Sequence, residues 1–122
     1  MKIVYIILGG ALGALARYGV TTFSVKTYGT SFPVGTLFVN LVGCLLIGIV
    51  FGLGEVRGIN PQFRLFFITG FLGALTTFST YSLETINNAN SGMTGLALVN
   101  IAVNNIGGLA LVKVGLLLAR II

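Results

Sequence analysis

The sequence predicts an all-α membrane protein with four transmembrane helices, the third of which is broken near the middle of the membrane. Of the 122 residues, 56% are hydrophobic and only 7% are charged, whereas a soluble domain usually has about 25% charged residues. The charges are widely separated, and the segments between them reach the roughly 20 apolar residues that a helix needs to cross a bilayer. Within one such segment, residues 70–82 combine glycine, threonine and serine, which disfavours a continuous helix.

The charged residues limit where the helices can lie. Residues 27–54, 65–83 and 85–112 carry no charged side chain, and two further uncharged stretches flank Arg17. We therefore expect helices over about residues 3–23, 34–53, 64–87 and 93–118, all in a single domain spanning residues 1–122. Turn-forming glycine and proline residues separate these segments. The chain should be a multi-pass protein of the cell (plasma) membrane.

The composition argues against several other classes of protein. The net charge is +5, but the cations are scattered singly, so lipid headgroups are expected as partners and nucleic acid is not. The chain has no histidine or aspartate, and Glu55 and Glu84 are its only acids, so no acid–base pair for an enzyme can be assembled. Cys44 is the single cysteine, which allows no disulfide within the chain.

Small residues recur at a spacing of four in the first two expected helices. Gly9 and Gly13 form one such pair, and Gly48 and Gly52 form another. Pairs of this kind let helix backbones approach closely in lipid. They suit oligomerisation, which four thin helices need in order to enclose a pathway, and they suit packing within one chain equally well.

The third expected helix contains the candidate break. The midpoint of a helix over residues 64–88 is Thr76, which should therefore lie near the bilayer midplane. Non-helical backbone survives at that depth only where protein, water or an ion satisfies it, so a break implies a site. Carbonyl oxygens released there would suit a small hard cation. The alternative is a packing face rich in serine and threonine.

Beyond the break, two rings and several amides point to an anion path. Phe78 and Tyr81 share a helical face at i, i+3, and the electropositive edges of such rings can meet an anion. The buried amide of Asn40 can donate to an anion. Ordinary packing is the alternative interpretation of the rings.

The fourth expected helix carries Asn100, Asn104 and Gly108 on one face, with Asn105 next to it. Polar residues in a span normally face a bundle interior or pore, and hydrogen bonding between helices explains these asparagines equally well. Arg17 and Glu84 are charged residues that also lie inside spans. Arg17 is either functional or reaches the interface, and Glu84 either pairs, reaches water or is protonated.

Over essentially the whole chain, these residues resemble the Fluc/CrcB family of fluoride channels. The resemblance is carried by Gly9-Gly10 through Arg17, by Gly35-Thr36-Leu37 with Val39-Asn40, and by Gly70-Phe71-Leu72-Gly73 through Thr77-Phe78-Ser79-Thr80. It implies an antiparallel, dual-topology dimer with two fluoride pores and one structural sodium ion at its centre. A homodimer is expected, with a heterodimer formed with a paralogue as the alternative.

The resemblance also implies roles for individual residues. Gly73 and Thr76 would offer backbone carbonyls to sodium. Tyr81 stands where the family usually has a second phenylalanine, and its hydroxyl could donate to the ion. Arg17, Asn100 and Asn104 are further candidates for a structural role or for the pore mouth, and for the two asparagines this does not follow from the resemblance, because the fourth expected helix matches no strict motif of the family. The residues expected along the fluoride pore are Asn40, Phe78, Tyr81, Thr36, Ser79, Ser82 and Glu84.

A small multidrug exporter is the second functional candidate, because it too is a short four-helix protein that pairs in the membrane. Such an exporter needs an acid in its first helix, where this chain has only Arg17. A third candidate is a subunit that conducts only together with a paralogue.

Overall fold

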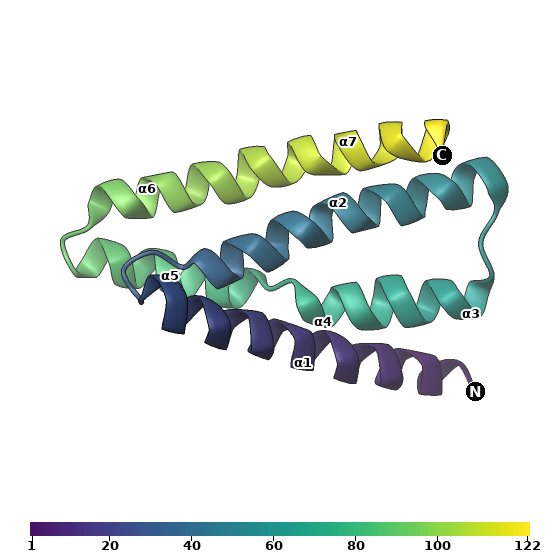
Figure 1. Cartoon of the computed structure of the whole chain (residues 1–122), viewed down its shortest axis with the longest axis horizontal. Coiled ribbons are helices and arrows are strands. Elements are labelled where there is room, and N and C mark those ends of the chain that lie inside the picture. Colours follow the sequence, from purple (N-terminus) through teal and green to yellow (C-terminus); the bar gives the residue numbers. More distant parts are fainter.

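Four helical spans lie alongside one another in the computed structural model, which describes residues 1–122 (Figure 1). The first two spans are the uninterrupted helices α1 (Lys2–Tyr28) and α2 (Val34–Arg57). The third consists of α3 (Pro61–Arg64), the π-helical segment η1 (Leu65–Leu72), α4 (Gly73–Leu75) and α5 (Phe78–Asn90). The fourth consists of α6 (Thr94–Ala102), the π-helical segment η2 (Val103–Gly107) and α7 (Gly108–Ile121).

All four spans are long and apolar enough to cross a membrane, which confirms that part of the prediction. Each is also longer than expected, with 27 residues in the first span and 24 in the second. A helix of that length reaches about 40 Å at 1.5 Å per residue, which exceeds the roughly 30 Å of the hydrocarbon core. Helix α1 is therefore long enough for its last turn, which contains Lys26, to reach the headgroup region.

The connections place both termini at the same end of the bundle. Figure 1 shows the N-terminus, the C-terminus and the α2–α3 connection at one end, and the α1–α2 and α5–α6 connections at the other. Gly29, Gly58 and Gly92 lie in these connections with φ of 80°, 79° and 80°. Only glycine adopts such values without a steric cost, which explains where the helices turn back.

The paired small residues pack within the chain. A Cβ atom on Gly9 or Gly13 would collide with the backbone carbonyl of Phe66 or Phe71. Gly48 approaches the backbone of α7 at Val112 in the same way. Helix α1 therefore packs against η1 and helix α2 against α7, and both glycine pairs serve intrachain packing.

The third span is interrupted at Thr76 and Thr77, halfway between Pro61 and Asn90. Thr76 has φ −88° and ψ 152°, and Thr77 has φ −150° and ψ 124°, so both are extended. The predicted break is thus present in the third span. Val39, Leu72 and Leu75 form the small apolar core next to the break, while many other large apolar side chains are exposed, as suits a protein surrounded by lipid.

Candidate functional site

A cavity of about 370 Å³ lies beside the helix break. It is lined from the second, third and fourth spans, and it brings five of the predicted pore and ion-site residues together with Asn104. None of the lining residues carries a charge; they are Asn40, Gly43, Cys44, Ile47, Ile68, Leu72, Gly73, Thr76, Thr77, Phe78, Tyr81, Asn104 and Asn105.

The backbone hydrogen bonds of a continuous helix are redirected at the break. The Thr77 N–H, which a helix would direct to the Gly73 carbonyl, donates to Asn40 Oδ1 at 2.9 Å. The Thr80 N–H, which a helix would direct to the Thr76 carbonyl, donates to Thr77 Oγ1 at 3.2 Å. The carbonyls of Gly73 and Thr76 have therefore lost the donors that helical geometry would supply, and both residues line the cavity.

Two other carbonyls at the break receive donors from side chains of neighbouring helices. Arg17 Nε donates to the Ala74 carbonyl at 2.9 Å, and Asn40 Nδ2 donates to the Thr77 carbonyl at 3.3 Å. A guanidinium within a span needs such an acceptor. In this structure Arg17 therefore supports the broken backbone.

Amide side chains continue from the break into the fourth span. Asn40 Nδ2 also donates to Asn104 Oδ1 at 3.1 Å, and Asn104 Nδ2 donates to Asn100 Oδ1 at 2.8 Å. Asn100, which is 1% exposed, donates to Thr85 Oγ1 at 2.9 Å, and Thr85 Oγ1 donates to the Tyr81 carbonyl at 2.7 Å. The chain of bonds connects α2, η2, α6 and α5. Asn40 Nδ2 donates one hydrogen to the Thr77 carbonyl and the other to Asn104 Oδ1, so both hydrogens of this amide are engaged within the protein.

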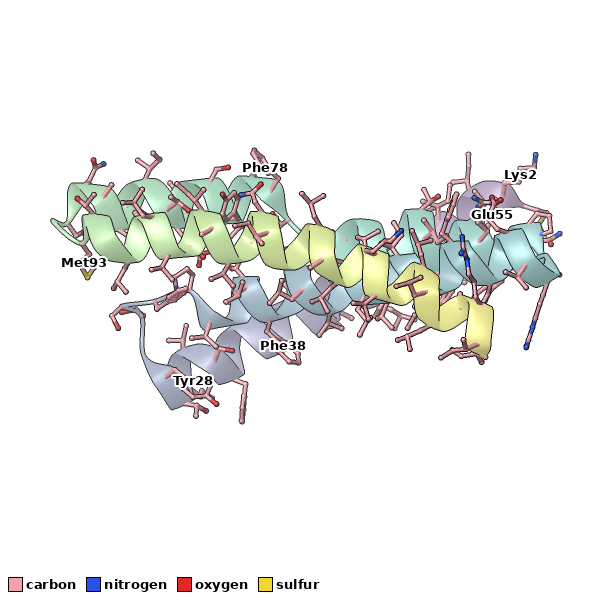
Figure 2. The ribbon with its side chains drawn as sticks, turned by 90° about the horizontal axis from the view of Figure 1, so that it is seen from above. Lys2, Tyr28, Phe38, Glu55, Phe78 and Met93 are labelled. Carbon is pink, nitrogen blue, oxygen red and sulfur yellow. The ribbon has the colours of Figure 1, made fainter.

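The two rings behind the break differ in their surroundings. Their centroids are 5.5 Å apart and their planes are inclined by 56°. Tyr81 is 8% exposed, whereas Phe78 is 77% exposed, and Figure 2 shows Phe78 pointing away from the bundle. Both rings line the cavity, and Phe78 is in addition largely uncovered within the protomer.

The structure does not bring every predicted site residue into this cavity. Thr36 and Glu84 line a second cavity of about 80 Å³ near the α1–α2 connection, where Glu84 Oε1 is buried without a hydrogen-bond partner. Ser79 is exposed and its hydroxyl lies 3.3 Å from Thr77 Oγ1. Ser82 lines neither of the two cavities.

Seven lining residues were not predicted as part of the site, namely Gly43, Cys44, Ile47, Ile68, Leu72, Thr77 and Asn105. Thr77 is adjacent to the predicted Thr76, and its side chain caps α5 by accepting from the Thr80 N–H. Such a cap is a signal that the sequence carries. The position of Asn105 depends on η2, which shifts the side chains around the helix and leaves no such signal.

Comparison with known proteins gives consistent matches along the chain. The model of the family described as "CrcB-like protein, Camphor Resistance (CrcB)" matches residues 4–116. A protein of Maridesulfovibrio salexigens named "Fluoride-specific ion channel FluC" is 47% identical, covering 99% of this chain and 97% of its own length. Proteins of the same name from Citrifermentans bemidjiense and Salinibacter ruber are 43% and 44% identical, covering 98% and 94% of this chain and 97% and 86% of their own lengths.

These relatives are named as ion channels and not as enzymes, which agrees with the absence of an acid–base pair from the sequence. The matches extend over the α1 glycines, the break and the asparagines of the fourth span alike. The chain belongs to the CrcB-like family.

Proposed function

We propose that this chain forms a fluoride-selective channel that lets fluoride leave the cell passively. The observation that carries the proposal is the uncharged cavity at the break of the third span, lined by amides, hydroxyls and aromatic rings. Fluoride is small and strongly hydrated, so a path must replace part of its water shell without trapping it, and several weak donors meet that need. The relatives named fluoride-specific ion channels support the same conclusion.

The proposed path runs over the ring edges of Phe78 and Tyr81. Both rings lie at the cavity, and their electropositive edges can stabilise an anion without a fixed positive charge. Thr36, Ser79, Ser82 and Glu84 would lie farther along the path, in the direction of the smaller cavity. Asn40, Asn100 and Asn104 would hold the wall of the path through their mutual hydrogen bonds.

The functional unit is proposed to be an antiparallel homodimer with two pores. One protomer leaves Phe78 mostly exposed, so a second copy would be needed to complete a wall around it. A two-fold axis in the membrane plane brings matching residues together only near mid-depth, where Thr76 lies. The alternative is a paralogue of opposite orientation as the second subunit.

The loop charges are compatible with dual topology. Lys2, Arg57 and Arg120 lie toward the end of the bundle that holds both termini, and Lys26 lies toward the other. Such a small excess biases the orientation only weakly under the positive-inside rule. Both orientations are therefore proposed to occur in the cell membrane.

A structural sodium ion at the centre of the dimer is also proposed. The carbonyl oxygens of Gly73 and Thr76 fit this role, because their helical donors are diverted to Asn40 and Thr77. Hard oxygen ligands of this kind suit a small hard cation. When bound, the ion would supply positive charge that holds the carbonyls of two protomers together.

Purified protein in liposomes tests the proposal directly. Vesicles loaded with potassium fluoride or potassium chloride are diluted into a buffer that contains neither fluoride nor chloride, with a potassium ionophore, and efflux is followed with ion-selective electrodes. Rapid fluoride efflux with much slower chloride efflux is expected, relative to protein-free vesicles. No fluoride efflux from the pure, folded chain would contradict a self-sufficient channel, and efflux restored by a co-expressed paralogue would indicate the heterodimer.

A further inference from the structure

Tyr81 and Asn105 form a hydrogen-bonded pair at the wall of the large cavity. Asn105 Nδ2 lies 3.0 Å from the Tyr81 hydroxyl oxygen, and the same nitrogen donates to the Ile101 carbonyl at 2.8 Å. A carbonyl oxygen can only accept, so the contact with Ile101 fixes which end of the Asn105 amide is the nitrogen. The Tyr81 oxygen is therefore the acceptor in this pair.

The assignment leaves the hydrogen of the Tyr81 hydroxyl for another acceptor. A phenolic hydroxyl both donates and accepts, and its accepting side is occupied by Asn105. Accepting a hydrogen bond polarises the O–H group and strengthens it as a donor. Tyr81 lines the cavity and is held there by burial, with 8% of its surface exposed.

We propose that the Tyr81 hydroxyl donates a hydrogen bond to the permeating anion and that Asn105 is the positioning residue that orients it. The inference rests on the proposed fluoride channel and assigns a specificity determinant to its path. Hydrogen bonds to an ion are stronger than those between neutral groups, and fluoride, the smallest halide, gains most from a compact donor. The pair would thus favour fluoride over chloride beyond what two ring edges provide.

Fluoride flux in liposomes tests the role of Tyr81 through the fluoride concentration that gives half-maximal flux, together with the ratio of fluoride to chloride efflux. Neither quantity depends on how many channels are folded. Tyr81→Phe removes one oxygen and keeps the ring, so conduction should persist while the half-maximal concentration rises about tenfold and the ratio falls. Tyr28→Phe, at a ring that is 63% exposed at the end of α1, is the matched control and should change neither.

The positioning role of Asn105 is tested with Asn105→Leu in both backgrounds. In the chain with Tyr81, the substitution should shift both quantities in the same direction as Tyr81→Phe, by a smaller factor. In the Tyr81→Phe background it should add no further shift, because the hydroxyl that it orients is gone. Equal shifts in both backgrounds would show that Asn105 acts independently and would overturn its assignment.

The outcomes separate this inference from the proposed function. Wild-type protein without fluoride flux overturns both proposals. If the wild-type protein conducts fluoride and Tyr81→Phe changes neither the half-maximal concentration nor the efflux ratio, the proposed channel stands. The proposed role of the Tyr81 hydroxyl as a donor is then overturned. If Tyr81→Phe does not elute like the wild type on gel filtration, the test uses Asn105→Leu, which retains Tyr81. An unchanged half-maximal concentration and efflux ratio in Asn105→Leu would then overturn the proposed role of the Tyr81–Asn105 pair.

Discussion

The side chain of Asn40 pairs with both backbone groups of Thr77. Its Oδ1 accepts from the Thr77 N–H at 2.9 Å and its Nδ2 donates to the Thr77 carbonyl at 3.3 Å. The amide thus replaces, from a neighbouring helix, the two bonds that the extended residue cannot make within its own helix. The break is stable because α2 supplies this pairing.

Asn40→Leu should therefore destabilise the protein. It keeps the branched shape of the side chain but leaves two backbone groups at the break without partners, each costing about 1–3 kcal/mol. Thermal unfolding monitored by gel filtration should show a lower midpoint temperature. Fluoride efflux from liposomes should also be reduced. Asn87→Leu, at an exposed position of α5, is the control and should behave as wild type. An unchanged midpoint in Asn40→Leu would show that the pairing does not stabilise the break.

Phe78→Ile should suppress fluoride flux by about tenfold or more while assembly remains intact. The substitution removes a ring edge and keeps a large apolar side chain at a position that is 77% exposed in the protomer. Flux per folded channel is the measurement, with gel filtration to verify assembly. Phe23→Ile, at a 66% exposed ring of α1, should conduct normally. Normal flux through well-folded Phe78→Ile would refute the ring-edge path.

Sodium removal should lower either the stability of the dimer or its activity. If the Gly73 and Thr76 carbonyls hold the ion, exchange for N-methylglucamine leaves oxygen atoms facing one another without a cation between them. Gel filtration and fluoride efflux after exhaustive dialysis are the measurements, and readdition of sodium should restore both. Full stability and activity in verified sodium-free buffer would contradict the proposed site.

Cysteine labelling should reveal both orientations. Gln62→Cys and Asn90→Cys place thiols at opposite ends of the bundle, in a Cys44→Ala background. Gln62 is preferred over Asn60, because Asn60 Oδ1 caps α3 by accepting from the Gln62 backbone N–H at 2.8 Å. In cells that express only this chain, each site should be labelled partly from each side by a membrane-impermeant reagent. Labelling of each site from one side only would rule out dual topology.

Gly48→Ala should weaken the packing of α2 against α7. The added Cβ would collide with the Val112 carbonyl oxygen and approach Gly115 Cα to 3.0 Å, and overpacking of this kind costs about 1–3 kcal/mol. Gly19→Ala is the control, since a Cβ there meets nothing within 4 Å and should stabilise α1 slightly. Thermal unfolding should show a lower midpoint for Gly48→Ala but not for Gly19→Ala. Equal midpoints in the two variants would show that α7 can move aside.

The sequence was informative wherever a local rule decides the structure. Charge-free lengths predicted the four spans, because lipid sets a minimum length for a helix. Low helix propensity and polar side chains around Thr76 predicted the break. The helix ends were placed too early, since Lys26 and Arg57 remain helical at the membrane surface, a position that composition alone does not distinguish from a loop.

Long-range relationships were beyond local rules. Nothing in the spacing of Asn40 and Thr77 indicates that they meet, because their contact depends on how α2 crosses the third span. The π-helical segment η2 rotates Asn105 toward Tyr81 and has no recognisable sequence signature. In the fourth span, Asn100 makes an interhelical bond to Thr85 of α5, whereas Asn104 and Asn105 line the cavity as well as making hydrogen bonds.

The break at Thr76 and Thr77 also has an electrostatic consequence for the centre of the membrane. It brings the C-terminal end of α4 and the N-terminal end of α5 within two residues of each other. A helix carries about half a negative charge at its C-terminal end and half a positive charge at its N-terminal end. One interruption therefore presents both polarities halfway along the third span, and the two helix ends by themselves add almost no net charge. The end of α4 would complement the proposed sodium ion and the end of α5 the proposed fluoride path, and the Arg17 guanidinium, bonded to the Ala74 carbonyl, is the charged group beside them.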